Sequence, residues 1–193
     1  MSQAHDALLK KYLRLPERLE AAIAGLSESD LDLRGAGWSI REYVHHTVEG
    51  ELLWQVNLRA ILGTDGIEFP FQWYFALSQD EWAQRWASDK RAIEPTLALF
   101  RASTHSLAEL LRCVDPESWK HHGLVTWPGA KEITHLTVRE IVLIHIGHMD
   151  QHTADIRAIR EMHKSSLSTI LLGNAGQANT NAHEEKPKKT KKN

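Results

Sequence analysis

Three histidines lie within eight residues near the end of the chain, in the segment HIGHMDQH at 145–152. At helical periodicity these histidines share the face of an apolar stripe that includes Ile141 and Met149. A buried imidazole needs a partner, because an unpaired buried polar group is costly. The partners are either separate hydrogen bonds for each ring or one metal ion that organises several of them.

The spacing limits which of these histidines can share an ion. His148 and His152 lie one helical turn apart, which suits two ligands of one metal, and His145 with His148 would also be compatible. His145 and His152 are about 10 Å apart along a helix axis, too far for one ion held about 2 Å from each nitrogen. One helix therefore supplies at most two ligands, and a third must come from elsewhere.

The segment VHHTVEGE at 44–51 supplies the best third ligand. On a helix over 40–62, His46 lies at the margin of the apolar face and Gly50 leaves room beside it, so we favour His46. We expect His45 to be exposed, or to contact a ligand rather than the metal. Glu51 stands on the apolar stripe and must pair with a histidine, a metal-bound water or an arginine, because a lone buried carboxylate would neutralise.

Each of these features also has a purely structural interpretation. A single histidine facing a core is usually hydrogen-bonded to a carbonyl or carboxylate, and a pair at i, i+4 is a weak metal signal alone. The pair together with His46 and the misplaced Glu51 favours a metal site. We expect His121 and His122 to be solvated loop residues and Cys113 not to be a nucleophile.

Helix periodicity and capping signals predict the elements that must position these residues. A helix over 3–25 is broken near Pro16, and longer ones cover 40–62, 89–114 and 138–163. Capping-box pairs begin two of them, Ser39 with Glu42 and Thr137 with Glu140, and a third pair precedes a short helix after Ser78. With no convincing strand pattern, the sequence predicts an all-α four-helix bundle with a short extra helix.

Composition narrows the class of protein further. The 193 residues fit one domain over 1–164, followed by a polar and finally basic tail over 165–193 that we expect to be disordered. The net charge of −2 gives no basic field for nucleic acid, and charged residues interrupt every apolar run near the N-terminus, which excludes a signal peptide or membrane span there. One cysteine fits a reducing cytoplasm.

Two motifs together resemble a known family. GWSIREYVHHTVEGE, followed about a hundred residues later by HIGHMDQHTADI, is similar to the DinB-like superfamily, also called the YfiT-like metal-dependent hydrolases. The resemblance implies an up-down-down-up four-helix bundle, often a homodimer, with one divalent metal bound by three histidines. Zinc or nickel would be commonest, with iron, cobalt or manganese as further options. The motifs place these ligands at His46, His148 and His152.

One departure concerns the residues after the last ligand. Many relatives have an arginine and a glutamine in the segment that here reads His152-Thr153-Ala154-Asp155-Ile156, so the surroundings of the ligand should differ.

Three imidazoles would leave open positions on the ion, as in catalytic sites. The ion would lower the pKa of a bound water or thiol, with Glu51 or His145 as the catalytic proton acceptor. The family includes bacillithiol- and mycothiol-dependent transferases, so we expect either a hydrolase or a transferase using a low-molecular-weight thiol, acting on a small molecule. The alternative is a non-catalytic bundle in which the ion has a structural or regulatory role.

Overall fold

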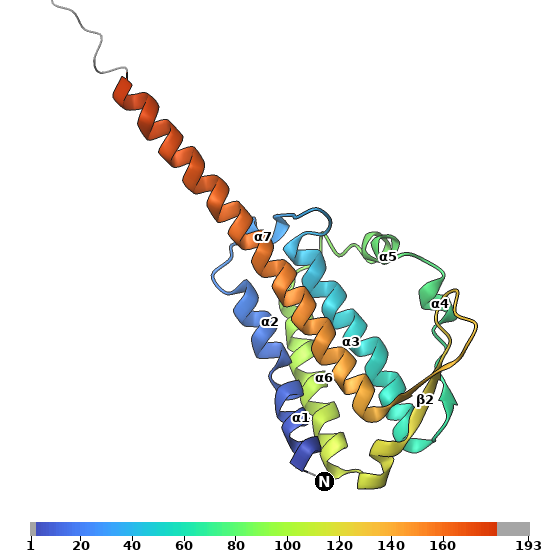
Figure 1. Ribbon diagram of the computed structural model, residues 1–193. Coiled ribbons are helices and arrows are strands. Elements are labelled where there is room, and N and C mark those ends of the chain that lie inside the picture. Colours follow the sequence, from blue (N-terminus) through green and yellow to red (C-terminus); the bar gives the residue numbers. More distant parts are fainter. Residues whose placement is uncertain (1–2, 181–193) are drawn as a thin grey trace, which may run out of the picture.

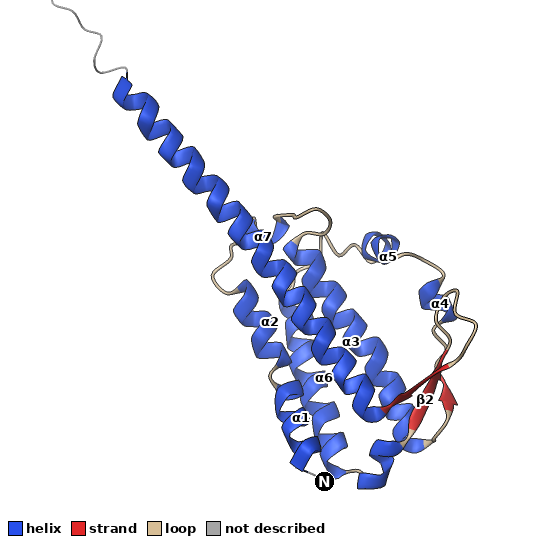
Figure 2. Cartoon of the chain, viewed as in Figure 1, coloured by secondary structure: helices blue, strands red, loops and turns tan. Residues whose placement is uncertain are grey.

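Four long helical segments form a bundle in the computed structural model, which describes residues 3–180 (Figures 1 and 2). The segments are α1 (Gln3–Leu13) continued by α2 (Leu15–Ile23), then α3 (Ile40–Gly63), α6 (Glu94–Cys113) and α7 (Val138–Thr180). In Figure 1 the first and last segments run upward and α3 and α6 run downward. The predicted up-down-down-up bundle is confirmed.

Local signals explain where most of these helices begin. The side chain of Ser39 accepts from the backbone N–H of Glu42, and the Glu42 carboxylate accepts from the backbone of Ser39. The pair Ser78 with Glu81 does the same for the short helix α5 (Gln79–Arg85), and Thr137 with Glu140 does so for α7. All three predicted capping boxes are confirmed.

Two prolines set boundaries. The break in the first segment falls at Arg14, between α1 and α2, so that Pro16 lies in the first turn of α2 as expected. Helix α6 begins at Glu94 rather than at the predicted residue 89. Pro95 explains this difference, because its missing N–H costs nothing in a first turn but would remove a hydrogen bond from a helix that began five residues earlier.

The long connections carry structure that the sequence pattern did not indicate. A three-stranded sheet consists of β1 (Ile67–Glu68), β2 (His122–Val125) and β3 (Thr134–Thr137), and a one-turn helix α4 (Gln72–Phe75) follows β1. β2 pairs in parallel with β1 and antiparallel with β3. His122 is thus in a strand, half-buried and paired with Asp65 at 2.8 Å, and His121 binds the carbonyl of Ile61, so the expectation of a solvated loop is wrong.

The bundle interior lies between two pairs of helices. The first segment packs against α6 and α7, and α3 packs against the same two helices from the other side. The apolar faces of all four segments meet there, with Leu15, Ile40, Phe100 and Ile141 fully buried. Because α3 and α7 are neighbours, their polar side chains at mid-height can meet.

Helix α7 is longer than the sequence predicts. It continues to Thr180, past the predicted end at 163, through a stretch without proline or any run of charge. The predicted disordered tail from 165 therefore begins with helix, residues 181–193 lie outside the described part, and the domain division at 164 stays a prediction. Within the described residues, neither α7 nor another helix is both long and apolar enough to cross a membrane.

Candidate metal centre

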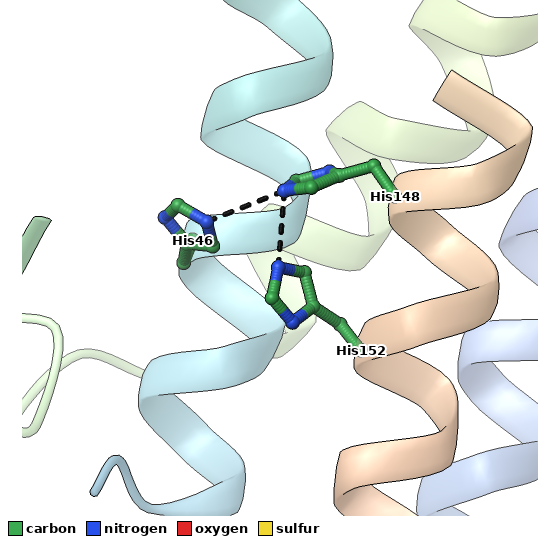
Figure 3. A group of neighbouring side chains, drawn as sticks. All are labelled: His46, His148 and His152. Carbon is green, nitrogen blue, oxygen red and sulfur yellow. Dashed lines mark hydrogen bonds between the residues drawn. The ribbon is translucent and has the colours of Figure 1, made fainter. Parts of the chain in front are cut away.

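Three histidines from two neighbouring helices turn their rings toward one point (Figure 3). His46 comes from α3, and His148 and His152 come from consecutive turns of α7. The Nε2 atom of His148 lies 3.3 Å from that of His46 and 3.0 Å from that of His152. One nitrogen from each ring lies within 4.8 Å of the other two. The structure thus brings together the three residues that the sequence selected.

Backbone geometry makes room for this cluster. The two α7 histidines share a face because they are four residues apart. On α3, a Cβ atom at Gly50 would lie 3.2 Å from the Cε1 atom of His148. The glycine therefore admits the ring of His148, whereas the sequence suggested that it makes room for His46.

Asp155 orients one of the three rings. Its carboxylate lies 3.1 Å from the Nδ1 atom of His152 and accepts a hydrogen bond from it. The proton then stays on Nδ1, so that the lone pair on Nε2 faces the other two histidines. Sequence reasoning missed this role, although a carboxylate three residues after a ligand on the same helix is a recognisable signal. The segment after His152, which differs from that of many relatives, thus contains the residue that orients this ligand.

The cluster favours neutral imidazoles. Burial, and then the nearby histidines, lower the pKa of His46 to about 3 and that of His148 to about 4. Burial also lowers the pKa of His152, although Asp155 opposes this shift. Neutral imidazole is the form that binds metal. Two nitrogens at about 2.05 Å from a tetrahedral zinc ion are about 3.3 Å apart, so the observed Nε2 separations of 3.0 and 3.3 Å fit such an ion.

A network of polar side chains lies in the bundle interior, around Glu51. The Nδ1 atom of His145 is 2.5 Å from the Oε2 atom of Glu51, and the hydroxyl of Tyr12 donates to Oε1. Gln55 donates to the same oxygen at 3.3 Å and to the Tyr12 hydroxyl at 3.2 Å. Glu51 and His145 are only 4% and 3% exposed. Of the partners expected for Glu51, the structure provides a histidine.

This network keeps a carboxylate ionised inside the protein. Burial alone would raise the pKa of Glu51, but the imidazole of His145 beside it and hydrogen bonds from Tyr12 and Gln55 outweigh this effect and lower the pKa. Burial, together with the Glu51 charge, raises the pKa of Tyr12 well above its usual value, so Tyr12 remains a donor. The Nε2 atom of His145 has no hydrogen-bond partner among the described residues.

One cavity connects the cluster with the buried network. It has a volume of about 330 Å³, and His46, His148, Glu51 and His145 all line it. Aromatic residues from α3, from α4 and from the loop after β2 complete its wall. A molecule in this cavity can therefore contact the histidine cluster and His145 at once.

His45 does not take part in this arrangement. It is fully buried, its Nε2 atom lies 3.2 Å from the carbonyl oxygen of Arg91, and its Nδ1 atom lies 2.9 Å from the hydroxyl of Thr96. The expectation that it is exposed or supports a ligand is wrong, because the segment leading into α6 covers that side of α3.

Comparisons with known proteins agree with this site. The family model of the DinB superfamily matches residues 11–156. A protein of Geobacillus thermodenitrificans named "Putative metal-dependent hydrolase" is 28% identical over 150 residues, which cover 76% of this chain and 79% of that protein. One of the same description from Bacillus licheniformis is 27% identical over 169 residues, or 82% and 89% of the two chains.

A solved structure shares the fold. YfiT from Bacillus subtilis, described as a probable metal-dependent hydrolase with an unusual four-helix bundle topology, superposes with a TM-score of 0.70 at 22% identity. The match covers 84% of this chain and 90% of YfiT.

Proposed function

Since this chain belongs to the DinB superfamily, we propose that it is a metal-dependent hydrolase whose divalent ion is held by His46, His148 and His152. Two relatives carry a description of that kind. A set of three imidazoles suits zinc and nickel among the available divalent ions. Bound there, such an ion supplies Lewis-acid chemistry and lowers the pKa of a water molecule beside it.

One observation carries this proposal. Among the described residues, the three Nε2 atoms have no acidic or carbonyl partner and point at each other, and the same cavity is lined by His145, whose Nε2 atom has no partner there either. A histidine cluster that served only to fasten α3 to α7 would not need a proton acceptor in a shared cavity.

The chain's own residues accept the proton that hydrolysis releases from water. His145 accepts the proton at Nε2, because this nitrogen has no partner among the described residues, whereas Nδ1 lies 2.5 Å from the Glu51 carboxylate. The ionised Glu51 stabilises the resulting imidazolium, and Tyr12 and Gln55 hold the carboxylate in place. The ring of Trp54, edge-on to that of His145 at a centroid separation of 6.1 Å, limits movement of the imidazole.

The test combines metal content with turnover of uncharged esters and amides. We expect His145→Gln to retain stoichiometric zinc and lose about a hundredfold in kcat, the usual contribution of a general base. His105→Ala, on the exposed face of α6, is the control and should change neither quantity. Unchanged turnover in His145→Gln would contradict the assigned role.

Two further arms separate the alternatives. Turnover that appears only when a low-molecular-weight thiol is added would point to a thiol transferase instead of a hydrolase. If chelation melts the fold and no substrate is turned over with the metal present, the ion is structural and the proposed function is wrong.

A further inference from the structure

The wall of the cavity beside the histidine cluster is aromatic. Trp54 lies at its centre, edge-on to Phe71 with ring centroids 4.8 Å apart and tilted against Trp127 at 6.1 Å. Phe75 bridges Phe71 and Trp127 at 5.7 and 5.8 Å. These rings hold one another in edge-to-face and tilted pairs, which are favourable geometries, so the wall is pre-formed.

The residues under the wall support it. Phe69 is almost fully buried and lies edge-on to both Trp54 and Phe71. A Cβ atom at position 123 would come within 2.4 Å of the Phe69 ring, so Gly123 in β2 is required for this ring to fit. The short sheet thus has a function in the architecture, since it fixes the far side of the cavity.

The charges in the cavity are one-sided. Of the described residues that line it, none is a lysine or arginine, whereas Glu51 is ionised. One polar group of the wall is engaged within the protein, because the Tyr74 hydroxyl donates to Gln79 at 2.7 Å. An anionic group placed against the aromatic wall, away from the histidine cluster, would lose its hydration, gain no cationic side chain and face a buried carboxylate.

We propose that the aromatic wall of this cavity selects an uncharged aryl group of the substrate; this inference rests on the proposed function in placing the scissile bond at the histidine cluster. A dry apolar cavity of about 150 Å³ is enough to bind benzene in another protein. The 330 Å³ here holds an aryl ring together with the ester or amide group that reaches His148 and His145.

The test uses benzamide and benzoate, which have nearly the same shape and differ in charge. Binding to the metal-free protein is measured by NMR titration, so that benzoate cannot be drawn to a metal. We expect benzamide to bind at least ten times more tightly than benzoate. Equal or tighter binding of benzoate, or no binding of benzamide, would overturn the inference.

Variants locate the bound ring. Trp127→Ala and Phe75→Ala, both in half-buried positions outside the bundle, should each weaken benzamide binding about fivefold to tenfold, as loss of an aromatic contact does. Trp73→Ala is the matched control, because Trp73 is 50% exposed and does not line the cavity. Unchanged binding in both cavity variants would place the ring elsewhere and contradict the inference.

The two proposals can fail separately. Selective benzamide binding without hydrolysis of any ester would leave the aryl pocket standing and remove the proposed function. Hydrolysis of small aliphatic esters with no benzamide binding would leave the proposed function standing and remove the aryl pocket.

Discussion

The histidines of α3 and α7 meet two different kinds of partner. His45 binds a backbone carbonyl and a threonine hydroxyl, so its two ring nitrogens are satisfied within the protein. His46, the next residue, has its Nε2 atom against that of His148, which in turn meets His152. Imidazoles that have only one another as partners leave lone pairs without protons, and a cation satisfies them. The partners of each ring therefore separate the structural histidine from the metal-binding ones, and burial differs in the same way, since His45 is fully buried and the three cluster histidines are half-buried.

The largest effect on zinc binding is expected when the middle ring of the cluster is removed. His148→Ala should weaken zinc binding by more than about a hundredfold, since even residues that only support a ligand contribute 10–100-fold. Elemental analysis and competition with a chelator measure the effect, with His105→Ala as the control. Retention of full zinc affinity would contradict the assignment of the ligands.

The reverse change tests the structural histidine. His45→Ala should leave zinc affinity within about twofold and lower the free energy of unfolding by about 2 kcal/mol, because it opens a cavity at a fully buried position and removes the partner of a half-buried hydroxyl and carbonyl. Urea denaturation of the metal-free protein gives this number. If zinc affinity fell as far as in His148→Ala, the distinction between the two groups would be lost.

A smaller effect on zinc binding is expected at Asp155, the residue that orients a ligand. Asp155→Ala should weaken zinc binding about tenfold, since the proton of His152 Nδ1 loses its acceptor and the ring loses its orientation. Glu161→Ala removes another α7 carboxylate, one that is exposed and paired with Lys164, and serves as the control. Equal affinities of the two variants would show that Asp155 does not orient the ligand.

The last prediction concerns pH. In the metal-free fold the pKa values of His46 and His148 are about 3 and about 4, below the 6.5 of free histidine. Between these values the unfolded chain binds more protons, so the free energy of unfolding should fall as pH decreases from 6.5 toward 4. Denaturant midpoints at pH 7.5, about 5.5 and about 4.5 test this. A smaller pH dependence in His148→Gln is expected, and an unchanged one would assign the effect to other groups.

The sequence predicted the parts of the site that local rules govern. The histidines at i, i+4 and the capping box before α3 follow from helical periodicity, so His46, His148 and His152 could be chosen correctly as neighbours. That Glu51 needs a partner followed from the cost of burying a carboxylate, but the sequence left open whether this partner is a histidine, a metal-bound water or an arginine. The metal, the small-molecule partner and the homodimer that the family resemblance implies stay predictions.

Non-local contacts account for what the sequence could not predict. The two-residue strand β1 exists because it pairs with β2, more than 50 residues away, and no pattern of its own marks it. His45 is buried by a segment that follows α5, and the aromatic wall combines residues from α3, α4 and a loop after β2. Such contacts depend on tertiary packing, which periodicity does not encode.

The most direct test of the central claim is X-ray absorption spectroscopy of the zinc-loaded protein. Three imidazole nitrogens at about 2.0 Å from the zinc ion are predicted, and the imidazole count should fall when His148 is replaced by alanine in protein that is held at excess zinc. A first shell without imidazole, or one that His148→Ala leaves unchanged, would contradict convergence of the three histidines on a metal.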